Sequence, residues 1–188
     1  MGKPECGIIS QLPARRPETT SKQARKKEKY DNADSYTTGS GGTSDNIRNL
    51  EIDWISGKVD ISYGKGNEIV LEEASKADIK DELAMRWLVE DGTLHIKFCK
   101  AGKINVNNCD KTLKVTLPKD LKLQEAEFET VSADITASEL HVKDVNFETV
   151  SGSVEAGLYG ARSIDADSVS GDIDITAPEE TKNADIET

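Results

Sequence analysis

The side chains with the clearest chemical potential recur at a fixed spacing in the second half of the chain. The string FETVSADIT begins at Phe128, and the similar string FETVSGSVE begins at Phe147. Nucleophilic catalysis by serine requires a histidine base and an acid that orients it. The sequence has two histidines, His95 and His141, and no such relay surrounds any serine, so we predict no catalytic serine. The recurring serines are instead expected to form one column of hydroxyls: Ser132, Ser151 and Ser170.

Carboxylates recur at the same spacing. Glu129, Glu148 and Asp167 would stand about 4.8 Å apart if successive repeats paired as parallel strands. Like charges in such a row repel each other, so either solvent screens them or a cation such as calcium bridges them. The calcium-binding nonapeptide pattern of other repeat proteins is absent. We therefore favour screening over this cation ladder, and predict no metal site and no cofactor.

The three cysteines leave redox chemistry open. Cys99 and Cys109 flank the stretch KAGKINVNN, which could bring them together as a disulfide in an oxidising compartment. Cys6 lies far away, near the N-terminus. Neither a C-x-x-C pair nor a nearby pair of histidines completes a zinc site.

The elements that would position these residues are strands rather than helices. Alternation of apolar and polar residues from Leu50 to Trp54 and from Val59 to Tyr63 is typical of half-buried strands. Asp91 and Gly92 separate two further alternating runs, which predicts a β-hairpin because the favoured turn takes positive φ at both central residues. The stretch ASKADIKDE is interpreted as a loop. Other strands are predicted in IVLEE, LAMRWLV, LHIKF and TLKVTLP.

The repeat length, together with strand-like alternation, indicates a β-solenoid, in which each repeat is one coil and cannot bury its inner face alone. We therefore predict an all-β, right-handed parallel β-helix-like fold with stacked coils of about 19–20 residues and a hairpin-containing N-terminal part. Each Val-Ser-Gly or Val-Ser-Ala step is expected to be a corner, with the valine inward and small residues permitting the bend. Apolar positions that align when the chain is laid over itself by one repeat are Leu121, Leu140 and Tyr159; Ala126, Val145 and Ile164; Val131, Val150 and Val169; and Ile135, Val154 and Ile173.

The N-terminal quarter has a different composition from the rest. Residues 1–46 show no sustained periodicity and include YTTGSGGTSDN, a stretch too poor in apolar residues to offset its chain entropy. We predict a disordered polar and basic tail over residues 1–46 and one domain over residues 47–188. Because Ala184–Thr188 repeats the approach to ETVSG, we expect that domain to be truncated in mid-coil, and its open end would allow end-to-end self-association.

Charge and hydropathy exclude several classes of protein. The formal net charge is −11, and residues 1–50 carry nine Lys or Arg against six Asp or Glu, so the acidic excess lies beyond them. The folded part should therefore repel nucleic acid. The basic run Arg25–Tyr30 lacks interleaved aromatic residues and favours a solvated tail. No apolar run has the length of a membrane helix or the form of a signal peptide, so we predict no transmembrane segment or export signal in this chain.

Several stretches resemble a known family when taken in order. They are IDWISGKVDISYG, DGTLHIKF, TLKVTLPKDLKL, ETVSGSV and SVSGDIDI, and the resemblance runs from about Ile47 to the end of the chain. They are similar to the bacterial "putative adhesin" repeat family, domain of unknown function 4097 (DUF4097). The resemblance implies a right-handed β-helix-like domain displayed outside the membrane, with roles in adhesion or envelope stress and no established catalytic residues.

Three classes of function follow. The first is a non-enzymatic binding or scaffold module of the bacterial cell surface, whose partner is a cell-wall polymer, a host glycan or an envelope protein. The alternative is an envelope-stress sensing domain coupled to a membrane partner. The third, a β-helix enzyme acting on polysaccharide, would need clustered acids with Arg or Lys, yet Arg86 and Arg162 lie far apart in sequence. Trp54 and Trp87 alternate inward, which favours core packing over sugar binding. We predict that the protein is not an enzyme.

Overall fold

The structure, a computed structural model, describes residues 33–100, 109–177 and 181–188. Apart from one short 3-10 helix, the regular elements among these residues are strands joined by turns and loops, and no helix among them has the length and hydropathy of a membrane span. The elements in chain order are η1 (Ala33–Ser35), β1 (Thr37–Thr38), β2 (Gly41–Thr43), β3 (Asn49–Gly64), β4 (Ile69–Ser75), β5 (Arg86–Glu90), β6 (Thr93–Lys97), β7 (Lys111–Pro118), β8 (Leu123–Thr149), β9 (Val154–Tyr159), β10 (Ser163–Ser168), β11 (Ile173–Thr176) and β12 (Asn183–Glu187).

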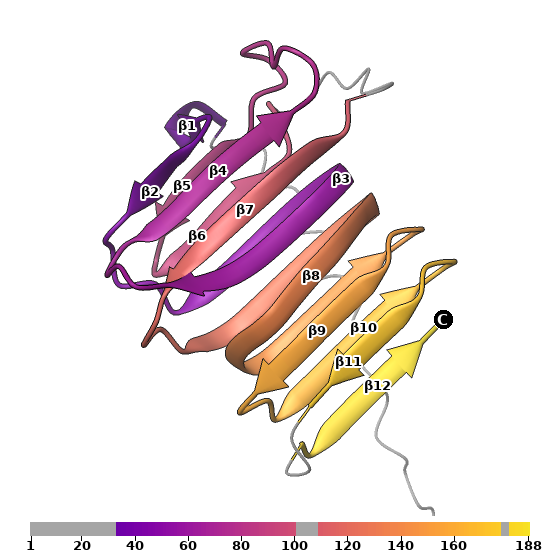
Figure 1. Cartoon of the computed structure of the whole chain (residues 1–188). Coiled ribbons are helices and arrows are strands. Elements are labelled where there is room, and N and C mark those ends of the chain that lie inside the picture. The colour runs from indigo at the N-terminus through magenta and orange to yellow at the C-terminus, as the bar shows by residue number, and fades with distance from the viewer. Residues whose placement is uncertain (1–32, 101–108, 178–180) are drawn as a thin grey trace, which may run out of the picture. The chain divides into compact units, whose positions relative to one another are not determined.

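Two long strands, β3 and β8, bend and thereby contribute to two faces (Figure 1). What we call the first face contains β1, β5, β6, the start of β3, both ends of β8, β10 and β12. The second face contains β2, β4, β7, the rest of β3, the middle of β8, β9 and β11. Each bent strand is therefore part of a coil that visits both faces.

The coils stack by parallel pairing. Ile52 of β3 pairs with Phe128 of β8, and Ile164 of β10 pairs with Val145 on one side and Ala184 on the other. The two partners of Ile164 therefore belong to the coil before it and the coil after it. The Phe128 and Phe147 rings stack with their centroids 4.9 Å apart and 12° between their planes. The predicted all-β solenoid is confirmed.

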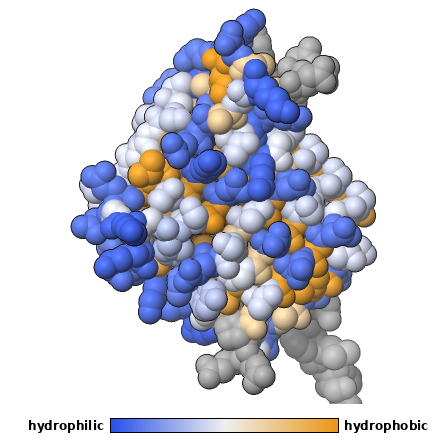
Figure 2. All heavy atoms as spheres, viewed as in Figure 1, coloured by the Kyte–Doolittle hydropathy of each residue, from blue (hydrophilic) through white to orange (hydrophobic). Residues whose placement is uncertain are grey.

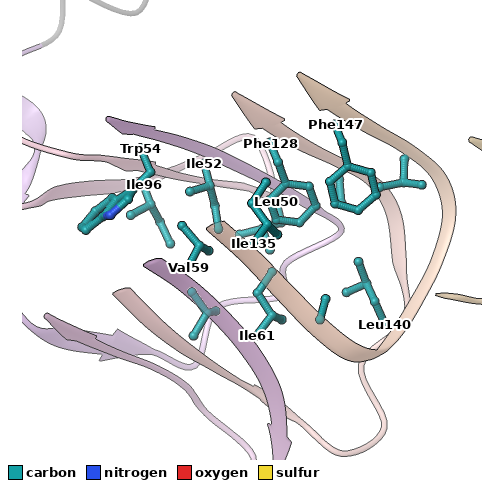
Figure 3. Packing of buried hydrophobic residues seen from close by; sticks show 14 of the residues in the cluster. Leu50, Ile52, Trp54, Val59, Ile61, Ile96, Phe128, Ile135, Leu140 and Phe147 are labelled. Atoms are coloured by element: carbon teal, nitrogen blue, oxygen red, sulfur yellow. The ribbon is translucent and has the colours of Figure 1, made fainter. Parts of the chain in front are cut away.

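The core lies between the two faces. Inward positions are mostly apolar, whereas Figure 2 shows hydrophilic side chains spread over the viewed surface with some hydrophobic ones between them. In Figure 3, Leu50, Ile52 and Trp54 approach Val59 and Ile61 from the opposite face. All five are at most 3% exposed. Each such side chain stabilises the fold by about 1.5–3 kcal/mol through burial, so the alternation in sequence specifies which side of each strand faces inward.

The corner between the faces differs from the prediction. The prediction has Val131 and Val150 pointing inward, but they are 50% and 48% exposed, whereas Thr130 and Thr149 are 6% exposed. The threonine hydroxyls explain this orientation. Thr149 Oγ1 accepts a hydrogen bond from the Gly152 amide (3.0 Å) and another from Thr130 Oγ1 (2.9 Å), so buried threonines satisfy backbone groups that the bend leaves without strand partners. A valine could not do so.

The small residues of the corner are needed because successive coils approach closely. A Cβ atom added to Gly152 would stand 1.9 Å from the Ala133 carbonyl oxygen, and one added to Gly171 would stand 1.9 Å from the Gly152 carbonyl oxygen. Both contacts are with backbone, which cannot move aside as a side chain can. The predicted role of small corner residues is thus confirmed.

Order begins earlier than residue 47, where the predicted domain starts. β1 pairs with β5 and β2 pairs with β4. The glycine-rich stretch packs closely here: a Cβ atom on Gly41 would lie 2.9 Å from the Trp87 ring, and one on Gly42 would lie 2.6 Å from the Ile69 carbonyl oxygen. Trp87 Nε1 also donates to the Gly39 carbonyl at 3.1 Å. The prediction of disorder up to residue 46 is therefore wrong for residues 33–46. Residues 1–32, with Cys6 and the basic run, lie outside the described residues.

The N-terminal part contains the antiparallel pairs. β5 and β6 form the predicted hairpin, with Glu90 paired to Thr93. Asp91 and Gly92 take φ values of 51° and 79° in its turn, as the Asp-Gly sequence predicts. The stretch interpreted as a loop lies between β4 and β5, apart from its first two residues, Ala74 and Ser75, which end β4.

A buried ion pair joins the antiparallel strands β4 and β7. The Lys111 ammonium lies 2.5 Å from Glu73 Oε1, and the two side chains are 0% and 4% exposed. The ammonium also donates to the carbonyl oxygens of Leu83 (2.6 Å) and Phe98, and it lies 3.9 Å from the centroid of the Phe98 ring. Glu73 in turn accepts from the Met85 amide. The pair is thus surrounded by partners, as a buried charge requires.

Candidate binding surface

The column of serines serves the structure of the corner. Ser132 Oγ donates to the Ile55 carbonyl, Ser151 Oγ to the Val131 carbonyl and Ser170 Oγ to the Val150 carbonyl, each at 3.2 Å. Each hydroxyl therefore hydrogen-bonds to the neighbouring coil. The two histidines contact carboxylates instead: His95 Nδ1 lies 2.9 Å from Glu51 Oε2, and His141 Nε2 lies 3.1 Å from Glu139 Oε1. The serines thus have the geometry of coil-to-coil connectors rather than of nucleophiles.

The structure brings the predicted carboxylates into one row on the first face. Glu148 pairs with Asp167, while Glu129 pairs with Asp53 at one end and Asp167 with Glu187 at the other. A parallel row on the same face contains Glu51 paired with Glu127, and Asp165 paired with Asp185. Adjacent positions in such rows are about 4.8 Å apart. We call these two sets the carboxylate rows.

These carboxylates do not converge on a point. Among the described residues, no three His, Cys, Asp or Glu side chains are placed to hold a metal ion. Along the row, Glu148 accepts a hydrogen bond from the Asn146 side-chain amide at 3.2 Å. The arrangement is therefore an extended anionic surface, and the choice between solvent screening, which we favour, and a cation bridging Glu129, Glu148 and Asp167 stays untested.

Basic side chains lie at the N-terminal end of the carboxylate rows. On β6, His95 contacts Glu51 and Lys97 Nζ lies 3.7 Å from Asp53 Oδ2. Lys97 also stands over the ring of Tyr36 at 5.7 Å. Burial, followed by the nearby charges of Asp53 and Glu90, raises the pKa of Tyr36 to about 12. The first face thus has a charge-paired end at β6.

The second face differs in charge pattern. Lys114 of β7 pairs in register with Asp60 on one side and with Glu72 on the other. Lys58 Nζ lies 2.9 Å from Asp60 Oδ1, and this hydrogen bond raises the pKa of Lys58. Opposite charges therefore alternate across β4, β7 and β3, although like charges also adjoin further along this face, where Glu155 of β9 pairs with Asp174 of β11.

An apolar column separates the two faces at the corner. Val131, Val150 and Val169 are 50%, 48% and 76% exposed, and Ile55 precedes them in register. The carboxylates of the first face lie two residues before these valines in sequence, and the serine hydroxyls lie one residue after. Each coil therefore presents the same succession of carboxylate, apolar side chain and hydroxyl.

Both candidate disulfide partners are free thiols in the structure. Cys99 is buried and Cys109 is half-buried. Burial raises the pKa of the Cys99 thiol, and the nearby Cys109 contributes to the shift in the same direction. Residues 101–108, which connect them, lie outside the described residues. The disulfide therefore stays a prediction.

Sequence reasoning missed a group of ring side chains at the opposite corner. The alignment of repeats at a constant offset placed Leu140 opposite Tyr159, but the structure pairs Leu140 with Leu158 and His141 with Tyr159. The difference comes from a register shift between Ala137 and Leu140. A repeat of constant length cannot reveal such a shift, although the aromatic side chains at Tyr63 and Tyr159 were visible in the sequence.

Comparisons with known proteins show which family the chain belongs to. No curated protein matches the chain. Among solved structures, one described as a "putative cell adhesion protein" from Clostridium sporogenes is 14% identical, with a TM-score of 0.41, over 80% of this chain and 98% of the other. A "putative adhesin" from Parabacteroides distasonis is 17% identical, with a TM-score of 0.33, over 80% of this chain and 68% of the other. Similarities this low carry no functional information. The model of the Toastrack DUF4097 family matches residues 47–188. The chain therefore belongs to the Toastrack DUF4097 family.

Proposed function

We propose that this protein is a non-enzymatic binding or scaffold module of the bacterial cell surface, located outside the cytoplasmic membrane. Its partner is an extended one, such as a cell-wall polymer, a host glycan or an envelope protein, and it lies along the stacked coils. The observation that supports this most directly is the register of the first face, where Glu148 faces Asp167 and then Glu187 at strand spacing. A surface with a one-coil repeat suits a ligand that extends over several coils.

The serine geometry supports the non-enzymatic part of the proposal. Each hydroxyl of the column donates to a backbone carbonyl of the neighbouring coil. A nucleophilic serine would instead donate its hydrogen bond to a base. A polysaccharide-active site would need arginine or lysine close to its acids. Arg86 is instead 8% exposed and donates to the carbonyl oxygens of Ala84 and Asp81. It holds the loop before β5 rather than an acidic sugar.

The test measures binding with charge variants matched between the two faces. The purified chain is mixed with cell walls, immobilised glycans and solubilised envelope proteins from its native bacterium. Glu148 and Asp167 pair on the first face, and Glu155 and Asp174 pair on the second, so E148Q/D167N and E155Q/D174N remove the same two charges from different faces. If the first face binds the partner, the first variant should change affinity by about tenfold and the second by less than twofold.

Two results would overturn the proposal. One is the absence of binding to walls, glycans and envelope proteins alike. The other is release of soluble sugar from wall or host polysaccharide by the wild-type chain, since this would make the protein an enzyme. Fractionation of native cells, followed by protease treatment of intact cells, tests the location: protection of the domain from the protease would contradict surface display.

A further inference from the structure

Three ring side chains form a column at the corner opposite the valines. Tyr63 of β3, His141 of β8 and Tyr159 of β9 come from three successive coils. The His141 and Tyr159 rings stack with centroids 5.2 Å apart and 30° between planes. The Tyr63 and His141 rings meet edge to face, with centroids 5.3 Å apart. We call this group the aromatic column.

Hydrogen bonds of the Tyr63 hydroxyl fix one end of the aromatic column. The Tyr63 hydroxyl accepts a hydrogen bond from the His141 backbone amide at 3.0 Å and donates to the Leu121 carbonyl at 3.3 Å. Tyr63 is half-buried, and burial raises the pKa of its hydroxyl. The phenol therefore stays neutral and keeps both hydrogen bonds. His141 is held through its own backbone, which leaves its ring in a defined place.

A bulge in β8 determines where Tyr159 lies in the aromatic column. The register shift between Ala137 and Leu140 places Tyr159 opposite His141 instead of opposite Leu140, which is 0% exposed. Gly157 permits the shift, because a Cβ atom there would lie 2.4 Å from the Ser138 carbonyl oxygen. Bulges commonly redirect a side chain at functional places. Here the bulge stacks Tyr159 on another ring at the surface.

The exposed groups of the column combine an apolar platform with hydrogen-bonding groups. Tyr159 is 51% exposed, more than any other aromatic side chain among the described residues. Beside it, His141 Nε2 and Glu139 Oε1 are 3.1 Å apart, with side chains 29% and 56% exposed. A tyrosine ring is rigid and amphipathic, with an apolar face and a polar hydroxyl. Carboxylate and imidazole add an acceptor and a group that can donate or accept.

We propose that the aromatic column is a binding subsite for a neutral glycan, with one sugar ring against Tyr159 and its hydroxyls hydrogen-bonded to Glu139 and His141. A pyranose ring presents a face of C–H groups and an edge of hydroxyls, which match the platform and its flanking groups. The net charge of −11 and the carboxylate rows of the first face disfavour acidic sugars. This inference rests on the proposed binding function and names its ligand class and contact residues.

The test uses neutral oligosaccharides as probes. The full chain is titrated with soluble oligomers of N-acetylglucosamine and of glucose, and affinity is measured by calorimetry while ring resonances of Tyr159 and His141 are followed by NMR. Replacement Y159A should weaken binding at least about tenfold, Y159F by a few fold and E139Q by several fold. V70A removes an exposed apolar group from β4, outside both the aromatic column and the valine column, and should leave affinity unchanged. Unchanged thermal unfolding of Y159A would show that the fold is intact.

The outcomes separate this subsite from the broader function. If the wild-type chain binds an oligosaccharide and Y159A binds it within twofold, the aromatic column is not the subsite, and the binding function stands. If the wild-type chain binds neither oligomer but does bind envelope proteins, the glycan inference is wrong and the module binds proteins. Perturbation of the Tyr159 and His141 resonances together with the loss in Y159A would support the subsite.

Discussion

Replacing Lys111 by methionine should destabilise the fold more than replacing any of the exposed charged side chains on the two faces. Methionine keeps an apolar stem of similar length, so the change reports mainly the loss of the ammonium. Glu73 would then stay buried, at 4% side-chain exposure, without the cation 2.5 Å away. The carbonyl oxygens of Leu83 and Phe98 would lose the same donor.

The magnitude follows from the burial of the pair. Removing one partner of a buried ion pair costs about 3–5 kcal/mol, because the remaining charge is left uncompensated. In a domain of this size, 1 kcal/mol lowers Tm by roughly 2–4 °C, so K111M should lower Tm by about 10 °C. Urea unfolding followed by circular dichroism measures the change in free energy directly.

Two further variants make the test specific. Lys114 lies on the same strand, β7, but is exposed, so K114M should change the free energy of unfolding by less than about 1 kcal/mol. E73Q/K111M removes both charges while the amide oxygen can still accept from Met85, and it should recover part of the loss. A K111M loss below about 1 kcal/mol, or a double variant as unstable as the sum of the single ones, would refute the reasoning.

The corner and two titrating groups give four further predictions. T149V removes the hydroxyl that contacts Thr130 and Gly152, and it should lower the free energy of unfolding in urea by about 1–3 kcal/mol. S151A removes an exposed hydroxyl and should lower it by less than about 1 kcal/mol. Equal losses in the two variants would contradict the roles assigned to these residues. G152A should cost about 1–3 kcal/mol, because its Cβ would overlap the Ala133 carbonyl; wild-type stability would show that the coils can separate. The pKa of the Tyr36 hydroxyl is raised in the folded state, from 10.0 to about 12. Its contribution to stability is therefore complete below pH 10 and is lost as the pH rises to 12. Thermal unfolding between pH 9 and 12 should show this decline in stability, and Y36F should make the decline smaller. Burial raises the pKa of Cys99, so iodoacetamide should alkylate Cys109 first in the reduced protein, as read by peptide mass spectrometry; faster labelling of Cys99 would contradict the burial.

Much of the fold was predictable because stacking imposes a repeat on the sequence. Phe128 and Phe147 recur at equivalent places since each coil packs on an equivalent one, and their rings do stack. The Asp91–Gly92 hairpin was predictable for a local reason, because few residue pairs accept positive φ at both positions. The acidic row could likewise be read from the repeat, as Glu148 and Asp167 occupy equivalent places.

The errors share one physical origin, which is that their causes lie in contacts between distant segments. Glycine-rich composition is common to flexible linkers and to tightly packed segments, and only the proximity of Trp87 to Gly41 distinguishes them. Thr149 and Val150 are both β-branched, so propensity does not determine which one turns inward at a bend. The hydrogen bond from the Gly152 amide to Thr149 Oγ1 determines that Thr149 turns inward.

The sequence by itself determined the strands, the parallel stacking and the coil length, because alternation and repetition are written in residue order. Tertiary structure alone decided which side chains share a place across unequal spacings. Glu73 and Lys111 come from different strands, β4 and β7, and form one buried pair. His141 and Tyr159 stack because a bulge makes their spacing in sequence shorter than the repeat. Such contacts depend on how the coils are packed in three dimensions, and no local pattern in the chain encodes them.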